Sequence, residues 1–275
     1  MKDSARPLRS ALYVPASNAR ALAKAQNLDV DAVIVDLEDA VAPDAKEQAR
    51  RAARAALAEG FGGAAKVLRV NAIDHPGFAD DMACAADADA VLLPKVERVA
   101  ALQAAREVLP SGTALWAMIE TPRGVLDALA LADALAAISA KGALVIGPND
   151  LAKETRIGGR AALMPLIVQI VAAARAAGLG VLDGVFNDFR DTEGFQAECA
   201  EGRRMGCDGK TLIHPAQIAP CNAAFSPSDE AVARARRIVA AFEGRLEGVI
   251  QMDGEMVERL HLAQAEALLR RADRR

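Results

Sequence analysis

Charged side chains follow short apolar runs of this sequence, always at the same end of the run. In chain order these residues are Asp36, Glu38, Asp39, Arg69, Lys95, Glu120 and Asp150. Carboxylates that are buried together carry their charge at a high cost unless a cation or basic side chains neutralise them. The pattern therefore predicts a site in which carboxylates hold a divalent cation opposite basic groups that bind an anionic substrate.

Glu120 and Asp150 are the predicted metal ligands, because each follows one of two consecutive apolar runs. The chain has 3 histidines and 4 cysteines, without a C-x-x-C pair or two histidines at helical spacing, so a nitrogen or sulfur site is hard to assemble. Mg²⁺ takes one or two protein carboxylates together with water and substrate oxygens, and Mn²⁺ can replace it. Both residues have structural alternatives, Asp150 as a helix N-cap and Glu120 at a helix start before Pro122.

Arg69 is the predicted substrate anchor. Its planar guanidinium can bind a carboxylate through two parallel hydrogen bonds, and Lys95 offers a second positive charge. Glu120 and Asp36 are expected beside the substrate as well. Each basic residue has an alternative role in a structural ion pair, which for Arg69 means Asp36 or Asp39 on the neighbouring run.

The apolar runs themselves predict the fold, because they alternate with longer stretches of helical periodicity. The eight runs are Ala11 to Pro15, Ala32 to Asp39, Lys66 to Asn71, Ala90 to Val96, Leu115 to Thr121, Ala143 to Leu151, Val181 to Phe186 and Lys210 to Pro215. Continuous hydrophobicity is typical of parallel strands covered on both faces. Eight strand and helix repeats favour an α/β fold, the (β/α)8 TIM barrel, whose C-terminal rim would bring the charged residues together.

The barrel is expected over residues 1–225, and residues 226–275 exceed what it needs. Ser226 to Glu243 begins with N-cap chemistry and continues with an amphipathic pattern, and a further helix is expected from about Gly254 to Ala272. We expect this C-terminal helical extension to act as a lid or as an oligomer contact.

Charge and composition limit the partners. A net charge of -4 provides no positive field to hold nucleic acid or an acidic membrane surface. The first residues are polar and lead straight into an apolar run, without the pattern of a signal peptide or a membrane span. We therefore expect a cytoplasmic protein whose partner is a small molecule.

Seven segments also carry a family resemblance. They are RSALYVPASNARALAKA (Arg9 to Ala25), IVDLEDAVAPDAKEQAR (Ile34 to Arg50), LRVNAIDHPGFADD (Leu68 to Asp81), LLPKVE (Leu92 to Glu97), MIETPRGV (Met118 to Val125), IGPNDLA (Ile146 to Ala152) and GCDGKTLIHPAQI (Gly206 to Ile218). In this order, over nearly the whole chain, they resemble the citrate lyase β-subunit-like (CitE-like) family, relatives of the malyl-CoA lyases. The resemblance implies a Mg²⁺-dependent carbon-carbon lyase on a barrel that forms homotrimers or hexamers.

The resemblance also assigns roles. It implies that Glu120 and Asp150 ligate the metal and that Arg69 binds the carboxylate end of the substrate. By the same resemblance, Glu38 and Asp39 line the pocket and Asp36 lies close by. Arg9 and Lys210 are linked to binding of CoA, which is part of the substrate.

The tail departs from the family pattern. Relatives carry an Asp there, supplied by a neighbouring subunit for acid/base catalysis, and Glu258 occupies its position in this chain. A carboxylate longer by one methylene can still move a proton, but a shift on the order of 1 Å can cost about 100-fold in rate. The candidate catalytic groups are therefore Glu38, Asp39 and Glu258, without a choice between them.

The leading hypothesis is cleavage of a β-hydroxyacyl-CoA, of the citryl-CoA or malyl-CoA type, to a thioester and an oxo acid. The metal would polarise the oxygen that becomes the carbonyl. A second hypothesis is an acyl-CoA thioesterase that uses the same metal site. Two others are a Schiff-base aldolase that uses Lys95 or Lys210, and a barrel retained as a subunit without catalysis.

Overall fold

The computed structural model describes residues 8–245 and 248–272, which form two compact units. One unit is Leu8–Ala224, and the other contains the described residues from Phe225 onward. Each has its own apolar core.

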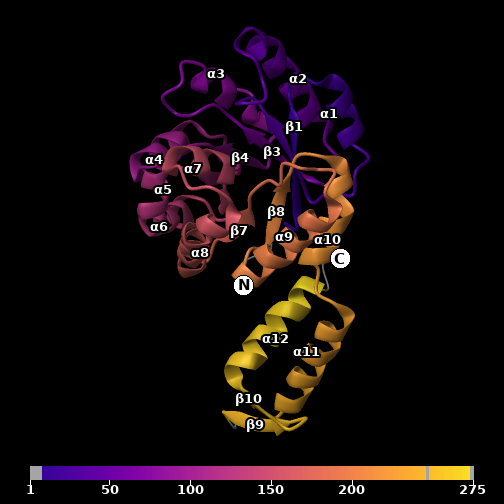
Figure 1. Ribbon diagram of the computed structural model, residues 1–275. Helices are drawn as coiled ribbons and strands as arrows, with labels where there is room; N and C mark the ends of the chain where they lie inside the picture. Colours follow the sequence, from indigo (N-terminus) through magenta and orange to yellow (C-terminus); the bar gives the residue numbers. More distant parts are fainter. Residues whose placement is uncertain (1–7, 246–247, 273–275) are drawn as a thin grey trace. The chain divides into compact units, whose positions relative to one another are not determined.

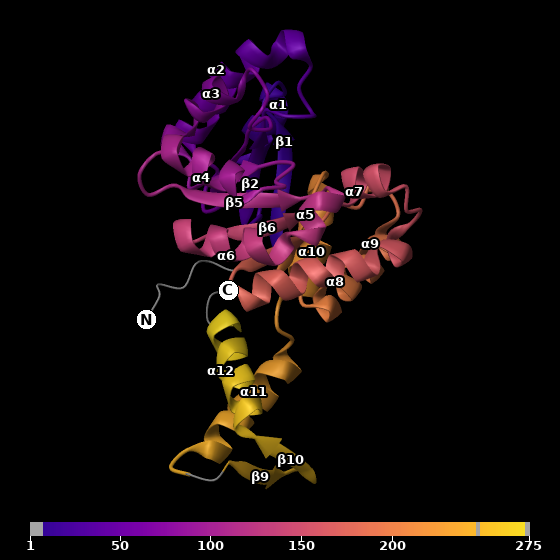
Figure 2. The same cartoon turned by 90° about the vertical axis from the view of Figure 1, so that its left-hand side faces the viewer.

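The larger unit is a closed barrel of parallel strands, numbered β1 to β8 in the order in which they pair. The strands are β1 (Ser10–Pro15), β2 (Ala32–Asp36), β3 (Ala65–Arg69), β4 (Ala90–Leu93), β5 (Ala114–Ile119), β6 (Ala143–Ile146), β7 (Gly180–Asp183) and β8 (Gly209–Leu212). Helices surround them (Figure 1; Figure 2). The predicted (β/α)8 barrel is therefore confirmed.

Ten α-helices within residues 8–225 lie outside the barrel strands. They are α1 (Ala19–Ala25), α2 (Lys46–Glu59), α3 (Phe78–Met82), α4 (Val99–Val108), α5 (Pro122–Leu126), α6 (Ala128–Ile138), α7 (Pro148–Thr155), α8 (Arg160–Ala176), α9 (Thr192–Met205) and α10 (Ile218–Phe225). Short 3-10 helices are η1 (Pro43–Ala45), η2 (Ala85–Asp87) and η3 (Pro215–Gln217).

The barrel interior is filled by alternate residues of the strands. Its buried members are Ala11, Ala32, Ile34, Val67, Ala90, Leu92, Ala114, Trp116, Met118, Ala143, Val145 and Leu182, with Tyr13 packed against them. Successive side chains of a strand point to opposite faces, so residues two positions apart share the interior. The residues between them face the helices, which explains why each strand is apolar on both faces.

Strand ends differ from the sequence-based expectation in one consistent way. Most predicted runs extend further than the strands that form, because the polar residues after each run belong to loops. The largest difference lies after β6, where Pro148 begins helix α7 at a position expected to continue the strand. Proline at the first turn of a helix has its φ already set and lacks only a donor that is unpaired there.

The smaller unit contains helix α11 (Asp229–Phe242), the antiparallel pair β9 (Val249–Met252) and β10 (Glu255–Glu258), and helix α12 (Arg259–Ala272). A helix from Gly254 was predicted, and that prediction is wrong over its first residues. Asp253 and Gly254 both have positive φ, 54° and 83°, and this pair forms the two-residue turn of a hairpin. Asp253 and Gly254 favour a tight turn between the short strands on either side, so the helix begins only after the hairpin.

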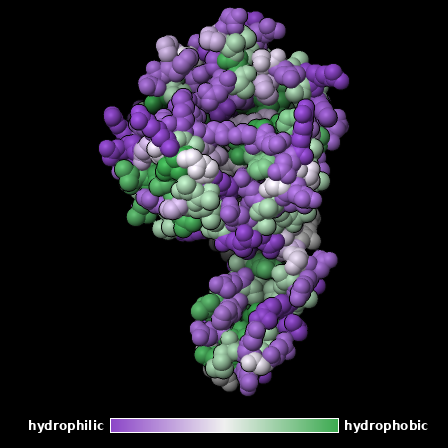
Figure 3. Space-filling model, viewed as in Figure 1, coloured by the Kyte–Doolittle hydropathy of each residue, from purple (hydrophilic) through white to green (hydrophobic). Residues whose placement is uncertain are grey.

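Apolar side chains also reach the surface of the barrel unit. Leu126, Leu129 and Val168 are among the large hydrophobic residues that are exposed. Figure 3 shows apolar atoms gathered on the side where α4, α6 and α8 lie in Figure 1. Within the described residues, no single helix is long and apolar enough to span a membrane. The bent pair α7 and α8 has the length and composition of a span only when its two helices are taken together.

Candidate active site

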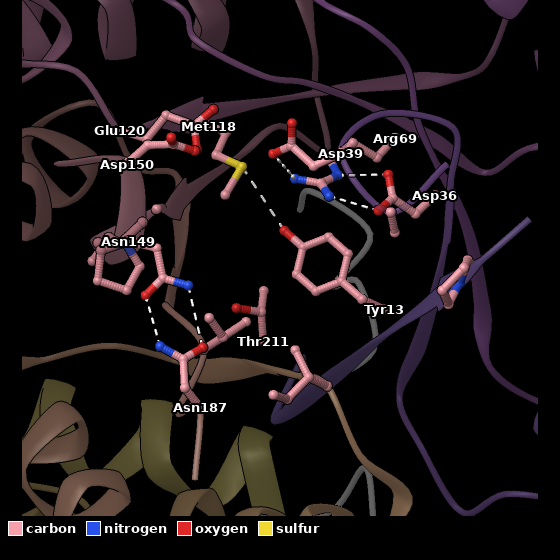
Figure 4. A pocket seen from close by; sticks show the side chains of 17 residues that line it. Tyr13, Asp36, Asp39, Arg69, Met118, Glu120, Asn149, Asp150, Asn187 and Thr211 are labelled. Atoms are coloured by element: carbon pink, nitrogen blue, oxygen red, sulfur yellow. Dashed lines mark hydrogen bonds and ion pairs between the residues drawn. The ribbon is translucent and has the colours of Figure 1, made fainter. Parts of the chain in front are cut away.

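A cavity of about 360 Å³ opens at the C-terminal ends of the barrel strands. Its size falls within the range of small-molecule sites, roughly 300–1,000 Å³, and this end of the barrel carries the active site in enzymes of this fold. Its polar lining, shown in Figure 4, comprises Tyr13, Asp36, Asp39, Arg69, Glu120, Asn149, Asp150, Asn187 and Thr211.

Arg69 is held at the cavity wall by the register of two strands. Asp36 and Arg69 are direct partners in the β2–β3 pairing, and both continue the interior stripe of their strands. The guanidinium donates two hydrogen bonds to the Asp36 carboxylate, at 2.8 and 2.6 Å. Burial lowers the pKa of Arg69, but the Asp36 carboxylate outweighs this effect and the net pKa is raised. The structural pairing that was open as an alternative therefore exists, and it presents a fixed guanidinium to the cavity.

Glu38 lies between two cations. Its Oε1 accepts a hydrogen bond from Lys95 Nζ at 2.6 Å, and its Oε2 is 2.8 Å from Arg69 Nη1 without hydrogen-bond geometry. Burial raises the pKa of Glu38 even though both cations act in the opposite direction. Glu38 and Lys95 line a neighbouring cavity of about 540 Å³, and Asp39 is the residue shared with the first cavity.

Lys46 fixes the loop that carries these acids. Its ammonium donates to the carbonyls of Leu37 and Glu38, at 2.6 and 2.7 Å, and to Asn71 Oδ1 at 2.9 Å. Burial lowers the pKa of Lys46, and nearby carboxylates act against that effect. In the sequence Lys46 follows Pro43 and resembles an exposed residue at the start of a helix, so this role was not predicted.

Lys95 connects Glu38 to Glu120 through a strained backbone. Its φ is 52°, in the left-handed region that side chains other than glycine seldom adopt. In this conformation its N–H donates to Glu120 Oε1 at 2.8 Å while its side chain reaches Glu38. Strain of this kind persists only where the surrounding contacts hold it, and it concentrates at functional sites.

Glu120 and Asp150 come together because they follow two neighbouring strands of the barrel, β5 and β6. Glu120 follows β5, and Asp150 lies in the first turn of α7 rather than at the end of a strand. Figure 4 shows the two carboxylates side by side. Burial, the charge of Glu38 and, further, that of Asp150 raise the pKa of Glu120 to about 8. A Cβ atom on Gly147 would collide with Glu120, so glycine makes room for this carboxylate.

These two carboxylates fit a divalent cation. Glu120 is 1% exposed, and no cationic side chain pairs with its carboxylate within the described residues. Its raised pKa shows that the ionised form is disfavoured there, and a bound cation would stabilise that form. No cluster of three or more His, Cys, Asp or Glu side chains suited to a metal occurs among residues 8–245 and 248–272. Two oxygen ligands match Mg²⁺, which keeps its other positions for water and substrate.

Three polar residues of the cavity, Tyr13, Thr211 and Asn149, were missed by the sequence reasoning, whereas Asn187 was expected at this rim as a polar residue after the seventh run. Tyr13 and Thr211 follow the alternation of the interior stripe, which was the signal that could have found them. Asn149 and Asn187 form a reciprocal pair of amide hydrogen bonds, at 3.2 and 2.9 Å, between the first turn of α7 and the loop after β7. No sequence pattern indicated that pair.

Arg9 and Lys210 are not brought to this cavity. Arg9 precedes β1, at the opposite end of the barrel, and makes a bidentate ion pair with Asp31. Lys210 is 0% exposed, and its ammonium contacts Asp183 and Glu198 at 2.9 and 2.7 Å. It lies on the helix-facing side of β8, because its neighbour Thr211 faces the cavity. The predicted CoA contacts of both residues therefore remain predictions that their positions do not support.

Glu258 belongs to the smaller unit. It ends β10, its side chain is exposed, and its N–H donates to His261 Nδ1 at 2.9 Å. Its role in catalysis remains a prediction.

Known proteins resemble this chain over nearly its full length. It is 46% identical to the (3S)-malyl-CoA thioesterase of Cereibacter sphaeroides, over 99% of this chain and 97% of that one. It is 32% identical to citrate lyase subunit beta of Escherichia coli, over 98% and 94% of the two chains. The CitE protein of Mycobacterium tuberculosis, solved with magnesium, acetoacetate and coenzyme A, is 32% identical, with a TM-score of 0.80 over 98% of this chain and 99% of that one.

A family model describes the same region that builds the barrel. The HpcH/HpaI aldolase/citrate lyase model matches residues 9–215, which include every residue of the cavity lining. The chain therefore belongs to the HpcH/HpaI aldolase/citrate lyase family.

Proposed function

We propose that this protein is a thioesterase that hydrolyses a CoA thioester of the malyl-CoA type. The observation that carries the proposal is the 46% identity, over 99% of the chain, to the malyl-CoA thioesterase of C. sphaeroides. The sequence alone favoured a carbon-carbon lyase, with hydrolysis as the alternative. The comparisons support that alternative better than the leading hypothesis.

The cavity suits an acyl group with a free carboxylate at one end. Arg69, fixed by Asp36, would bind that carboxylate. Glu120 and Asp150 would hold Mg²⁺ opposite it, where the cation stabilises negative charge on an oxygen of the acyl group. Arg69 and the two carboxylates line one cavity, so together they would hold the thioester against the wall of that cavity.

Asp39 is the proposed base within the barrel unit. Glu38 lines the neighbouring cavity rather than this one, and its two oxygens lie 2.6 and 2.8 Å from Lys95 and Arg69. Asp39 lines the cavity, is 59% exposed, and approaches Arg69 and Lys95 only to 3.9 and 3.8 Å. It would take a proton from water as the water oxygen attacks the thioester carbon. The carbon-sulfur bond then breaks, and the CoA thiolate takes up a proton to leave malate and free CoA.

Neither lysine suits Schiff-base chemistry, which needs a neutral amine. Lys210 is buried between carboxylates. Burial lowers the pKa of Lys95, but the hydrogen bond to Glu38 outweighs this and the net pKa is raised, so its amine stays protonated.

A product analysis with (3S)-malyl-CoA tests the proposal. The purified protein is incubated with the thioester, with Mg²⁺ or with EDTA, and the products are separated by mass spectrometry. We expect malate and free CoA thiol with Mg²⁺, and loss of turnover with EDTA. Turnover that persists in EDTA would contradict the metal site.

Carbon-carbon cleavage is the second candidate, favoured by the family match and by the similarity to CitE. It would give acetyl-CoA and glyoxylate in the same assay, without release of thiol. That product pattern would replace the thioesterase proposal while leaving the roles of Arg69, Glu120 and Asp150 intact.

A further inference from the structure

Tyr13 is the single tyrosine of the chain. It lies on β1, two residues after Ala11, so its side chain continues the interior stripe of the barrel into the cavity. Figure 4 shows its hydroxyl aimed into the cavity, with Arg69 on one side and the Glu120 and Asp150 carboxylates on the other.

The hydroxyl has only a weak partner. It contacts the Met118 sulfur at 3.8 Å, and a thioether is a poor acceptor. No other hydrogen bond to it occurs within the described residues. Tyr13 is half-buried, and its hydroxyl lines the cavity, so its capacity to donate is directed at whatever occupies that space. A ligand oxygen in the cavity would provide the missing acceptor.

The ring is fixed by its neighbour. The Arg69 guanidinium lies 4.8 Å from the centroid of the Tyr13 ring, within the range of a cation-π contact. Asp36 orients the same guanidinium. The hydroxyl is therefore held at a set position relative to the carboxylate that Arg69 would bind. Burial raises the pKa of Tyr13, which keeps the hydroxyl a neutral donor.

We propose that Tyr13 donates a hydrogen bond to the hydroxyl oxygen on the acyl carbon next to the carboxylate held by Arg69, and so selects 3-hydroxyacyl groups that end in a carboxylate. This inference rests on the proposed function. Because the tyrosine ring packs against the guanidinium, its hydroxyl would lie close to the carbon next to a carboxylate bound by Arg69. A site built to bond a substrate hydroxyl discriminates against the analogue that lacks it, because the protein donor is then left unpaired.

The experiment compares two thioesters that differ only in that hydroxyl, malyl-CoA and succinyl-CoA, in the full-length protein with Mg²⁺. Tyr13→Phe removes one oxygen atom and keeps the ring. We expect kcat/KM for malyl-CoA to fall about 10-fold, the effect of losing one neutral hydrogen bond. The value for succinyl-CoA should stay the same or rise. An equal loss on both thioesters, or no change on either, would overturn the proposal.

Val14→Ala is the matched control. Val14 is the next residue of the same strand, is buried at 3% exposure and points toward the helices. It should lower the melting temperature and leave the ratio of the two kcat/KM values unchanged. A fall in that ratio for this variant would mean that disturbance of β1, rather than the hydroxyl, sets the preference.

A binding measurement separates this proposal from the proposed function. Free (S)-malate and succinate are titrated by calorimetry into the wild-type protein and Tyr13→Phe, each loaded with Mg²⁺. We expect tighter binding of malate in the wild type and loss of that preference in the variant. Failure of the wild type to turn over either thioester would refute the function alone, whereas equal binding of both acids by the wild type would refute the role of Tyr13.

Discussion

The alternation of side chains along each strand explains why Asp36 and Arg69 face the cavity. It also explains why Asp183 and Lys210 do not face it. Each strand has two faces, and the cavity receives only the residues that continue the interior stripe. Asp183 follows the interior residue Leu182, so it points toward the helices, where Arg160 and Lys210 pair with it. Residue type and position at a strand end therefore predict a charged rim. The alternation of side chains along the strand decides which of these charged residues line the cavity.

The pH dependence of stability tests the carboxylate site. The folded-state pKa of Glu120 is about 8, above its ordinary 4.5. An acid with a raised pKa binds its proton more tightly in the folded state, so its stabilising contribution is complete below pH 4.5 and is lost as the pH rises through 8. In EDTA we expect the free energy of unfolding, measured by urea denaturation, to fall by a few kcal/mol over this window, since one pKa unit corresponds to about 1.4 kcal/mol.

Glu120→Gln is the control for that measurement, because glutamine does not titrate. The variant should show a flatter dependence of stability on pH. Mg²⁺ should stabilise the wild type most at pH 8, where it favours the ionised carboxylate, and should have little effect on the variant. The same slope in both proteins would mean that Glu120 is not the titrating group.

At the scale of elements, the sequence predicted the eight strands and most of the covering helices because burial on both faces leaves a strong apolar signal. It did not predict α7, because the apolar run was expected to continue to Leu151, whereas β6 ends at Ile146 and Gly147 is the N-cap of the helix. It also missed the hairpin of β9 and β10. The two residues predicted as metal ligands, Glu120 and Asp150, lie side by side, although Asp150 belongs to a helix.

The turn between β6 and α7 sets the position of Glu120. We expect Gly147→Ala to abolish the rise in melting temperature on adding Mg²⁺ and to lower turnover at least 10-fold, because the new methyl group would displace the Glu120 carboxylate. Thermal unfolding with and without Mg²⁺ measures this. Gly158→Ala is the matched control, since its added Cβ meets nothing within 4 Å. Unchanged Mg²⁺ binding in Gly147→Ala would contradict the assignment.

Lys210 joins β7, β8 and α9 through buried ion pairs. We expect Lys210→Met to cost about 3–5 kcal/mol of unfolding free energy, because Asp183 would keep its charge with one partner fewer. Denaturant unfolding measures this, with the exposed Lys24→Met as control. The double variant with Asp183→Asn should recover part of the loss. A stable Lys210→Met protein with a raised KM for CoA thioesters would instead favour the CoA contact implied by the resemblance.

At the scale of the whole molecule, the division into two units raises the question of what the smaller one does. It has its own core, formed by α11, α12 and the hairpin. Glu258 lies at the end of that hairpin, exposed and separate in sequence from every residue of the cavity. We propose that this unit acts as a lid or an oligomer contact and brings Glu258 to the active site of a neighbouring subunit in a trimer or hexamer.

A complementation experiment tests that proposal. Glu258→Gln and Glu120→Gln should each reduce turnover of malyl-CoA strongly, because one lacks the acid/base group and the other a metal ligand. When the two variants are unfolded together and refolded as mixed oligomers, some sites will combine an intact Glu120 from one subunit with an intact Glu258 from another. We therefore expect the mixture to regain part of the wild-type activity, in proportion to those sites, with the oligomer size measured by light scattering. If the mixture stays as inactive as its components while forming oligomers, Glu258 does not act at the active site of a neighbouring subunit.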